Sequence, residues 1–221
     1  MESRPTETER THRDRSFRAD EPESPEREGF FKPFTTGEIV IIAVLGIVLG
    51  IGGTPMAVLV RFLNTAGGEL GFVAQATVLG WFYLAGVLGG YIVRKPGAAT
   101  LCEVISGVGQ VLSGNPNGVI VLYTTFAQGL GADIGYALFR YRNWGLAAVA
   151  LAGALSVPLG FFADAWFFGF PNFDLPLLVA FIVRVISGIV FAIVGVGIIR
   201  AVARAGVLGG TALDREARAT R

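Results

Sequence analysis

The chain has 221 residues, of which 52% are hydrophobic and 16% are charged, and its formal net charge at pH 7 is +1. These values, with a mean hydropathy of +0.60, exclude an ordinary water-soluble domain and predict a membrane protein.

Residues 1–34 carry 16 of the 35 charged side chains, nine acidic and seven basic. Such a segment cannot bury enough apolar surface to offset the entropy of ordering, so we predict a disordered cytoplasmic tail. The segment lacks the apolar core and the small-residue cleavage site of a signal peptide. We therefore expect the first apolar run to be retained.

From Thr36 onward, six apolar runs alternate with short polar or Gly- and Pro-containing connections. Crossing the hydrocarbon takes roughly 20 helical residues, which most runs provide. The third run is shorter and rich in Gly and Ser, which indicates a helix buried within the bundle or one that ends in a re-entrant turn. We predict an all-α membrane protein in which residues 35–205 form a bundle of six transmembrane helices and residues 206–221 a cytoplasmic tail. The runs are 36–63, 72–93, 98–113, 119–139, 145–168 and 175–205.

Basic residues indicate the orientation of the bundle. The connections after the second and fourth runs and the C-terminal end contain Lys or Arg, and the connections after the third and fifth runs contain none. Because cytoplasmic loops hold the excess of basic residues, both termini should be cytoplasmic. Asp164, Asp174 and Glu69 then lie on the outer side, and Arg61, at the end of the first run, is the exception to the pattern.

A stripe of small residues follows one face of the first run. Gly residues allow helices to approach closely in a membrane, where no hydrophobic effect drives association. The stripe either packs within this chain or docks a separate membrane subunit. Its members are Ala43, Gly46, Ile47 and Gly50.

Small and polar residues also recur at helical spacing along the third run, at Glu103, Ser106, Gly107 and Gln110. A charge near the middle of a membrane helix costs about 2.5–3.5 kcal/mol on insertion scales. This face should therefore meet a cavity or a neighbouring helix rather than lipid. Glu103 either contacts a ligand or forms an ion pair with Arg184 in the sixth run, and the two roles are compatible.

The fourth run places Gln128 and Asp133 inside an apolar segment. Thr124 shares the face of Gln128, whereas Asp133 lies about 140° away around the helix. Asp133 either contacts a ligand or pairs with a basic residue at the cytoplasmic edge, such as Arg140. Gln128 and Gln110 either line a pocket or hydrogen-bond across helices.

Several chemistries lack the residues that they require. The only histidine, His12, lies in the charged tail, and the only cysteine is Cys102. A serine–histidine dyad, a zinc site or a thiolate cluster within the membrane is therefore excluded. The sequence also has no Gly-x-x-x-x-Gly-Lys-Ser/Thr loop. We therefore expect no cofactor or metal, and another protein must supply the energy if the chain transports a solute actively.

Four segments stand out together, namely Arg94–Glu103, the Gly114-Asn115 turn, Gln128–Asp133 and Phe139–Arg142. At these segments the chain resembles the YkoE-type substrate-binding (S) component of energy-coupling factor (ECF) transporters, and the resemblance covers residues 36–204. It implies a multi-pass protein of the cell membrane that captures thiamine or its hydroxymethylpyrimidine precursor from outside. It also implies partners, namely a transmembrane coupling subunit and a pair of cytoplasmic ATPases that hydrolyse the ATP, so that this chain is a transport subunit and not an enzyme. The family generally has glutamate where this chain has Asp133.

An aminopyrimidine suits the polar residues of the third and fourth runs, because its ring nitrogens and amino group can pair with a carboxylate or an amide. Two aromatic residues deep in the second run could stack on its ring, although core packing is their other role. The alternatives are a small oligomeric membrane channel and a transporter for a different vitamin-like solute. The expected substrate-binding residues are Glu103, Gln110, Gln128, Asp133, Trp81, Tyr83 and Asn115.

Overall fold

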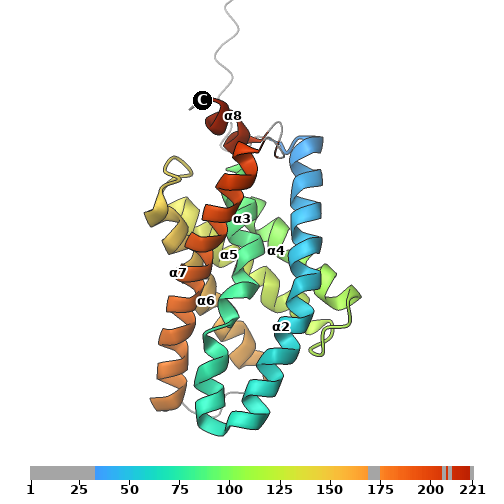
Figure 1. The fold of residues 1–221 in the computed structure, drawn as a ribbon, viewed down its shortest axis with the longest axis vertical. Coiled ribbons are helices and arrows are strands. Elements are labelled where there is room, and N and C mark those ends of the chain that lie inside the picture. Colours follow the sequence, from blue (N-terminus) through green and yellow to red (C-terminus); the bar gives the residue numbers. More distant parts are fainter. Residues whose placement is uncertain (1–32, 169–174, 206–207, 209–210, 220–221) are drawn as a thin grey trace, which may run out of the picture. The chain divides into compact units, whose positions relative to one another are not determined.

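The computed structural model describes residues 33–168, 175–205, 208 and 211–219. The predicted N-terminal tail therefore lies, up to residue 32, outside the described residues. The described part is helical and contains no β-strand (Figure 1), which confirms the all-α class. The elements are α2 (Thr36–Ala76), η1 (Leu79–Tyr83, a 3-10 helix), α3 (Leu84–Val93), α4 (Ala98–Leu112), α5 (Ile120–Leu138), α6 (Leu146–Phe168), α7 (Leu175–Arg204) and α8 (Ala212–Ala219).

Four of these helices match single predicted runs. α4, α5, α6 and α7 begin and end within one residue of the third to sixth runs. Glycines with positive φ border α4 and α5, namely Gly97 (82°), Gly114 (81°) and Gly118 (66°). Glycine adopts this conformation without steric cost. Gly97 and Gly118 precede the starts of α4 and α5, and Gly114 follows the end of α4.

The first two runs meet where the sequence predicts, but their helices differ from the prediction in detail. α2 continues past the predicted end at Leu63 and is broken at Gly68, where φ is 52° and ψ is −134°. The chain reverses there and returns along α2 (Figure 1). The returning segment changes from α to 3-10 geometry at Leu79–Tyr83 before α3 begins. The reversal therefore falls within the predicted connection, residues 64–71, but the second run is not one regular α-helix, because η1 interrupts it.

Four segments are long and apolar enough to cross a membrane: Thr36–Gly68, Leu70–Val93, Leu146–Phe167 and Leu175–Arg204. α4, with 15 residues, is a shorter apolar helix. The described helices therefore fit a multi-pass membrane protein, and the count of six passes stays a prediction.

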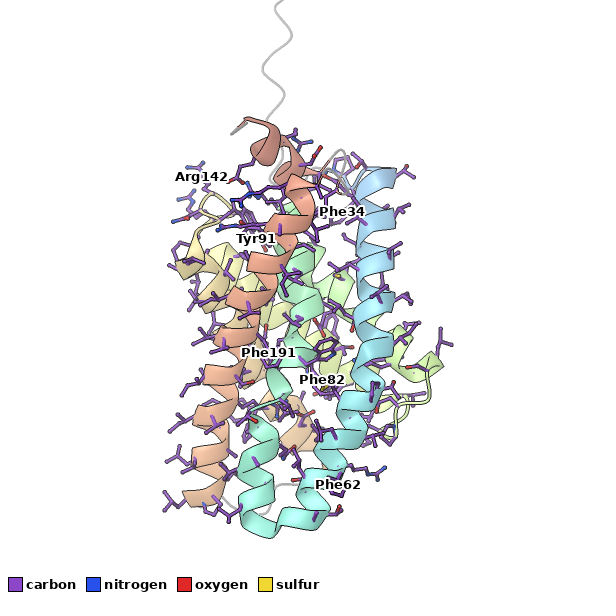
Figure 2. All side chains as sticks on the ribbon, in the orientation of Figure 1. Phe34, Phe62, Phe82, Tyr91, Arg142 and Phe191 are labelled. Atoms are coloured by element: carbon purple, nitrogen blue, oxygen red, sulfur yellow. The ribbon has the colours of Figure 1, made fainter. Side chains whose placement is uncertain are left out.

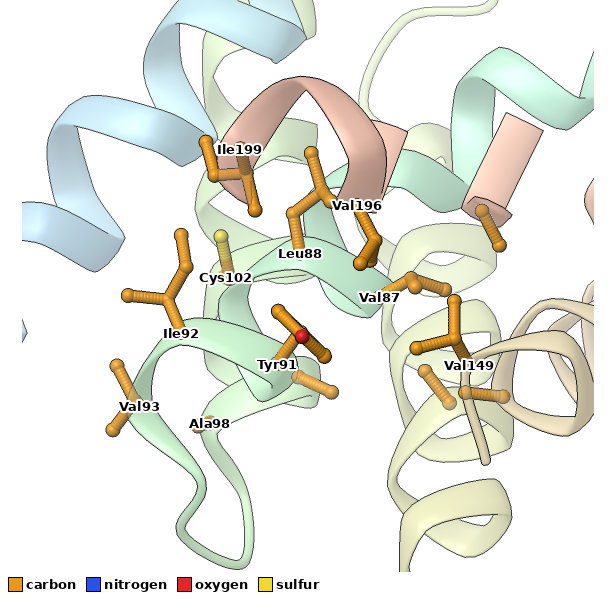
Figure 3. Close-up of a cluster of buried hydrophobic side chains, with 14 of the residues drawn as sticks. Val87, Leu88, Tyr91, Ile92, Val93, Ala98, Cys102, Val149, Val196 and Ile199 are labelled. Atoms are coloured by element: carbon orange, nitrogen blue, oxygen red, sulfur yellow. The ribbon is translucent and has the colours of Figure 1, made fainter. Parts of the chain in front are cut away.

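α3 occupies the centre of the bundle. All its residues, Leu84 to Val93, are buried, and it contacts α2, α4, α5, α6 and α7. Its Leu88 belongs to one apolar cluster with Cys102 of α4, Val149 of α6 and Val196 of α7 (Figure 3). A helix that is apolar on every side requires neighbours on every side, and the other helices supply them.

α2 lies directly against the backbone of α4. A Cβ at Gly46 would meet Ile105 Cγ2 at 2.8 Å, and a Cβ at Gly50 would overlap the carbonyl oxygen of Ser106. Both glycines therefore pack within this chain, which is the first of the two alternatives for the stripe. Its other members, Ala43 and Ile47, are half-buried.

Basic residues from separate connections gather at one end of the bundle, here called the basic end. Arg94 forms an ion pair with Glu216 of α8, and Lys95 Nζ lies 2.6 Å from Glu38 Oε2 at the start of α2. Arg142 lies at the same end (Figure 2). α8 packs on α3 and α7, so the stretch predicted as a C-terminal tail contains a helix that joins the bundle.

Candidate functional site

A cavity opens between α2, η1, α4, α5, α6 and α7, toward the end of the bundle opposite the basic end. It has a volume of about 80 Å³ and continues into an outer recess of about 380 Å³. The two spaces share six residues, which are Ala57, Val60, Leu79, Asn117, Asp164 and Arg184. The cavity is also lined by Phe82, Gln110, Val121, Thr124, Thr125 and Gln128, and the recess by Arg61, Asn64, Phe72 and Gln75.

Gln110 reaches the cavity from the last turn of α4 and is 2% exposed. Its Oε1 accepts a hydrogen bond of 2.9 Å from Asn115 Nδ2. Asn115 Oδ1 in turn accepts from the backbone N–H of Asn117. Asn115 therefore holds both the Gln110 amide and the loop after α4, but it does not itself line the cavity.

Gln128 enters the cavity from α5 and lies against Gly160 of α6. A Cβ at Gly160 would come within 2.6 Å of Gln128 Cγ. The Gln128 amide makes no hydrogen bond to a described residue, and its Oε1 is buried. An unpaired buried amide of this kind requires a partner. Thr124, one turn earlier, lines the same cavity.

Arg184 and Asp164 form an ion pair on the shared wall of the cavity and the recess, with 2.8 Å between Arg184 Nη2 and Asp164 Oδ2. Arg184 Nε donates to the hydroxyl oxygen of Tyr83, and the guanidinium lies over the rings of Tyr83 and Phe161 at 5.6 and 5.8 Å. The ion pair that the sequence offered for Glu103 is not formed, because Arg184 turns to Asp164 instead. Tyr83 contacts Arg184 but does not itself line the cavity or the recess.

Glu103 lies between two helices and outside the set of residues that line the cavity. Its side chain is fully buried and fits between Gly86 of α3 and Gly129 of α5. Its Oε2 accepts a 2.5 Å hydrogen bond from the Gly86 N–H in the first turn of α3. Such N–H groups lack a partner within their own helix, so Glu103 caps α3.

Among the described residues, the side-chain polar atoms that are buried without a hydrogen-bond partner are Trp81 Nε1, Glu103 Oε1 and Gln128 Oε1. All three belong to residues that the sequence singled out. The Trp81 ring packs on Gly52 of α2. Buried polar atoms are rarely left unpaired, so this group of residues is where a ligand could supply hydrogen bonds.

Asp133 lies toward the basic end and supports the start of α4. Its carboxylate accepts from the Thr100 N–H at 2.9 Å, from the Thr100 hydroxyl at 2.5 Å and from the Gly97 N–H at 3.2 Å. Gly97 has no side chain to cap the helix, so Asp133 replaces the missing cap. Tyr141 also donates to Asp133 Oδ1, and burial and the Asp133 carboxylate raise the pKa of Tyr141 above its usual range, which keeps it a donor. The pairing of Asp133 with Arg140, which was one alternative from the sequence, is not among these contacts.

An Asp133→Ala variant is therefore expected to lose stability, by about 1–3 kcal/mol, because buried donors at the start of α4 lose their acceptor. Asp133→Asn keeps one acceptor oxygen and should lose less. Thermal unfolding in detergent measures both. Lower ligand affinity at unchanged stability would instead make Asp133 a ligand contact.

Sequence comparison places the chain among transport proteins. Residues 37–159 match the model of a family described as "ABC-type cobalt transport system, permease component". The chain is 32% identical over 187 residues to the Bacillus subtilis (strain 168) protein named "Putative HMP/thiamine permease protein YkoE", and the match covers 84% of this chain and 92% of that protein.

Structural comparison agrees. The fold superposes on a solved crystal structure of an S-component of an ECF transporter with a TM-score of 0.81 and 30% sequence identity, covering 86% of this chain and 95% of the other. Because the matches extend over most of both chains, the chain belongs to the YkoE-type family of S components and is a membrane subunit of an ECF transporter.

Proposed function

We propose that this S component captures hydroxymethylpyrimidine or thiamine in the cavity between Gln110 and Gln128. The observation that carries the proposal is the buried Gln128 amide, which has no hydrogen-bond partner among the described residues. One amide offers a donor and an acceptor side by side, and so does the edge of a 4-aminopyrimidine. The name of the Bacillus subtilis relative supports the same ligand class.

The other residues expected at the site take supporting roles in this proposal. Glu103 Oε1 and Trp81 Nε1 are available to a ligand that reaches deeper than the cavity. Tyr83 and Asn115 fix Arg184 and Gln110 on the walls. Asp133 fixes the start of α4, the helix that carries Gln110.

The transport cycle requires partners. We propose six membrane passes with the basic end in the cytoplasm, so that the cavity opens to the outside. A transmembrane coupling subunit and a pair of ATPases would then supply the energy. The Thr36–Gly68 part of α2 suits contact with the coupling subunit, because 22% of its apolar 18-residue stretch is buried within this chain, against 72% for that of the returning segment Leu70–Val93. Ala43 and Ile47, half-buried beside Gly46 and Gly50, lie on this helix.

Calorimetric titration of the purified full-length chain tests the proposal. Hydroxymethylpyrimidine or thiamine should bind saturably at one site, and Gln128→Leu should weaken binding about tenfold, the effect of losing one or two hydrogen bonds. Cobalt(II) is the comparison ligand, because the matching family is described by cobalt transport. Saturable binding of cobalt(II) without binding of either pyrimidine would overturn the proposal. An ATP-independent ion current in liposomes would favour a channel.

Gly160→Ala should weaken pyrimidine binding about tenfold with little loss of stability. The added methyl would come within 2.6 Å of Gln128 Cγ and 3.2 Å of Nε2, so the amide must shift into the cavity. Gly197→Ala is the matched control, since a Cβ there meets nothing within 4 Å. Equal affinity of the two variants in the same titration would show that Gly160 does not position Gln128.

A further inference from the structure

We infer that the outer recess is an anion subsite, which binds the phosphate of a phosphorylated pyrimidine whose ring occupies the cavity. The inference rests on the proposed function and adds a preference for phosphate esters over the unphosphorylated ligands. The cavity and the recess share six lining residues, so one ligand can extend from one to the other.

The distribution of basic residues is the first observation. Among the described residues, Lys and Arg concentrate at the basic end, and the two arginines outside that group are Arg61 and Arg184. Both line the recess. Arg61 is also the residue that departs from the alternation of charge along the sequence. The two arginines outside the basic end therefore line the same recess.

The charge balance of the recess is the second observation. Asp164 neutralises Arg184 through the 2.8 Å ion pair. The Arg61 side chain is exposed and makes no ion pair or hydrogen bond with a described residue, although its backbone carbonyl accepts from Thr65. Of the described residues that line the recess, Asp164 is the one acid. The described lining therefore carries one uncompensated positive charge.

The chemistry of this lining fits a phosphate. The guanidinium of arginine presents several N–H donors in a planar fork that matches phosphate oxygens. Asn64, Gln75 and Asn117 place further amides on the same wall. A thiazolium cation would be repelled by Arg61, whereas a phosphate ester would be attracted. The recess should therefore favour the monophosphate of hydroxymethylpyrimidine over the free alcohol, and thiamine monophosphate over thiamine.

Calorimetric titration with hydroxymethylpyrimidine and its monophosphate tests the inference, with full-length protein in detergent free of phospholipid. We expect the ester to bind about tenfold more tightly and to lose much of this advantage as the salt concentration rises. Arg61→Gln should remove the advantage and leave the affinity for the free alcohol unchanged. Arg142→Gln is the matched control, an exposed arginine at the basic end, and should keep the advantage.

The outcomes separate the inference from the proposed function. If the free alcohol binds and the ester binds equally or more weakly, the anion subsite is wrong and the pyrimidine site stands. The same holds if Arg61→Gln and Arg142→Gln behave alike. If neither pyrimidine binds, the proposed function fails and the inference fails with it.

Discussion

An Arg184→Met variant should unfold at a clearly lower temperature than the parent protein, with a loss of about 3 kcal/mol in the free energy of unfolding. Methionine leaves Asp164 without its cation and the Tyr83 hydroxyl without its donor. Removing one partner of a buried ion pair costs about 3–5 kcal/mol, since the other charge stays buried. Because the Asp164 side chain is 19% exposed to solvent, the loss of stability should lie near the lower end of this range.

Two further variants make this result specific. Arg184→Met/Asp164→Leu should recover most of the stability, because apolar residues often replace a buried ion pair without cost. Arg204→Met, at an exposed position near the end of α7, should melt like the parent. Thermal unfolding in detergent measures all three. If the single variant Arg184→Met is as stable as the parent, the ion pair does not stabilise the fold.

Gly50→Leu is expected to have the other large effect, a loss of about 3 kcal/mol or more. A Cβ at this position would overlap the Ser106 carbonyl oxygen and lie 3.1 Å from Gly109 Cα. Leucine must therefore push α2 away from α4. Membrane helices depend on close packing of this kind, because lipid is as apolar as their own side chains.

The control for Gly50→Leu is Gly197→Leu in α7, where a Cβ meets nothing within 4 Å. The yield of folded monomer and its melting temperature in detergent should fall for Gly50→Leu and not for Gly197→Leu. Normal melting of Gly50→Leu with loss of transport would instead assign Gly50 to the contact with the coupling subunit.

The limits of most helices could be predicted because they depend on local signals. The third to sixth apolar runs end at glycines with positive φ or at short polar segments, and each helix follows its run within one residue. The reversal at Gly68 lies in the polar, Gly-containing connection 64–71 that the sequence predicted, whereas the 3-10 segment at Leu79–Tyr83 lies in continuous apolar sequence. Hydropathy alone could not place the 3-10 segment.

The partners of the buried charges could not be predicted from the sequence, because they depend on helix rotation and packing. Glu103 and Arg184 fall inside apolar runs, but their helices present them to Gly86 and to Asp164. Glu103 caps α3, whose start at Leu84 was hidden within the second run. Asp133 caps α4, whose first residues the sequence did place correctly, although the contact itself joins residues 33 apart.

The polar face of α4 and α5 was the most informative part of the sequence. Helical spacing placed Gln110 on the small and polar face of its run and Thr124 beside Gln128, and all three line one cavity. The sequence singled out Asp164 only by its predicted position on the outer side and Arg61 only as the exception to the charge pattern. Their common recess could not be predicted, because it lies between residues of α2, η1, α6 and α7 that only the fold brings together.

A crystal structure of the full-length protein with hydroxymethylpyrimidine bound is the most direct test of the central claim. The account predicts the pyrimidine ring between Gln110 and Gln128, with its amino group and a ring nitrogen within hydrogen-bond distance of the Gln128 amide. A ring bound elsewhere, with the Gln128 amide still unpaired, would contradict it.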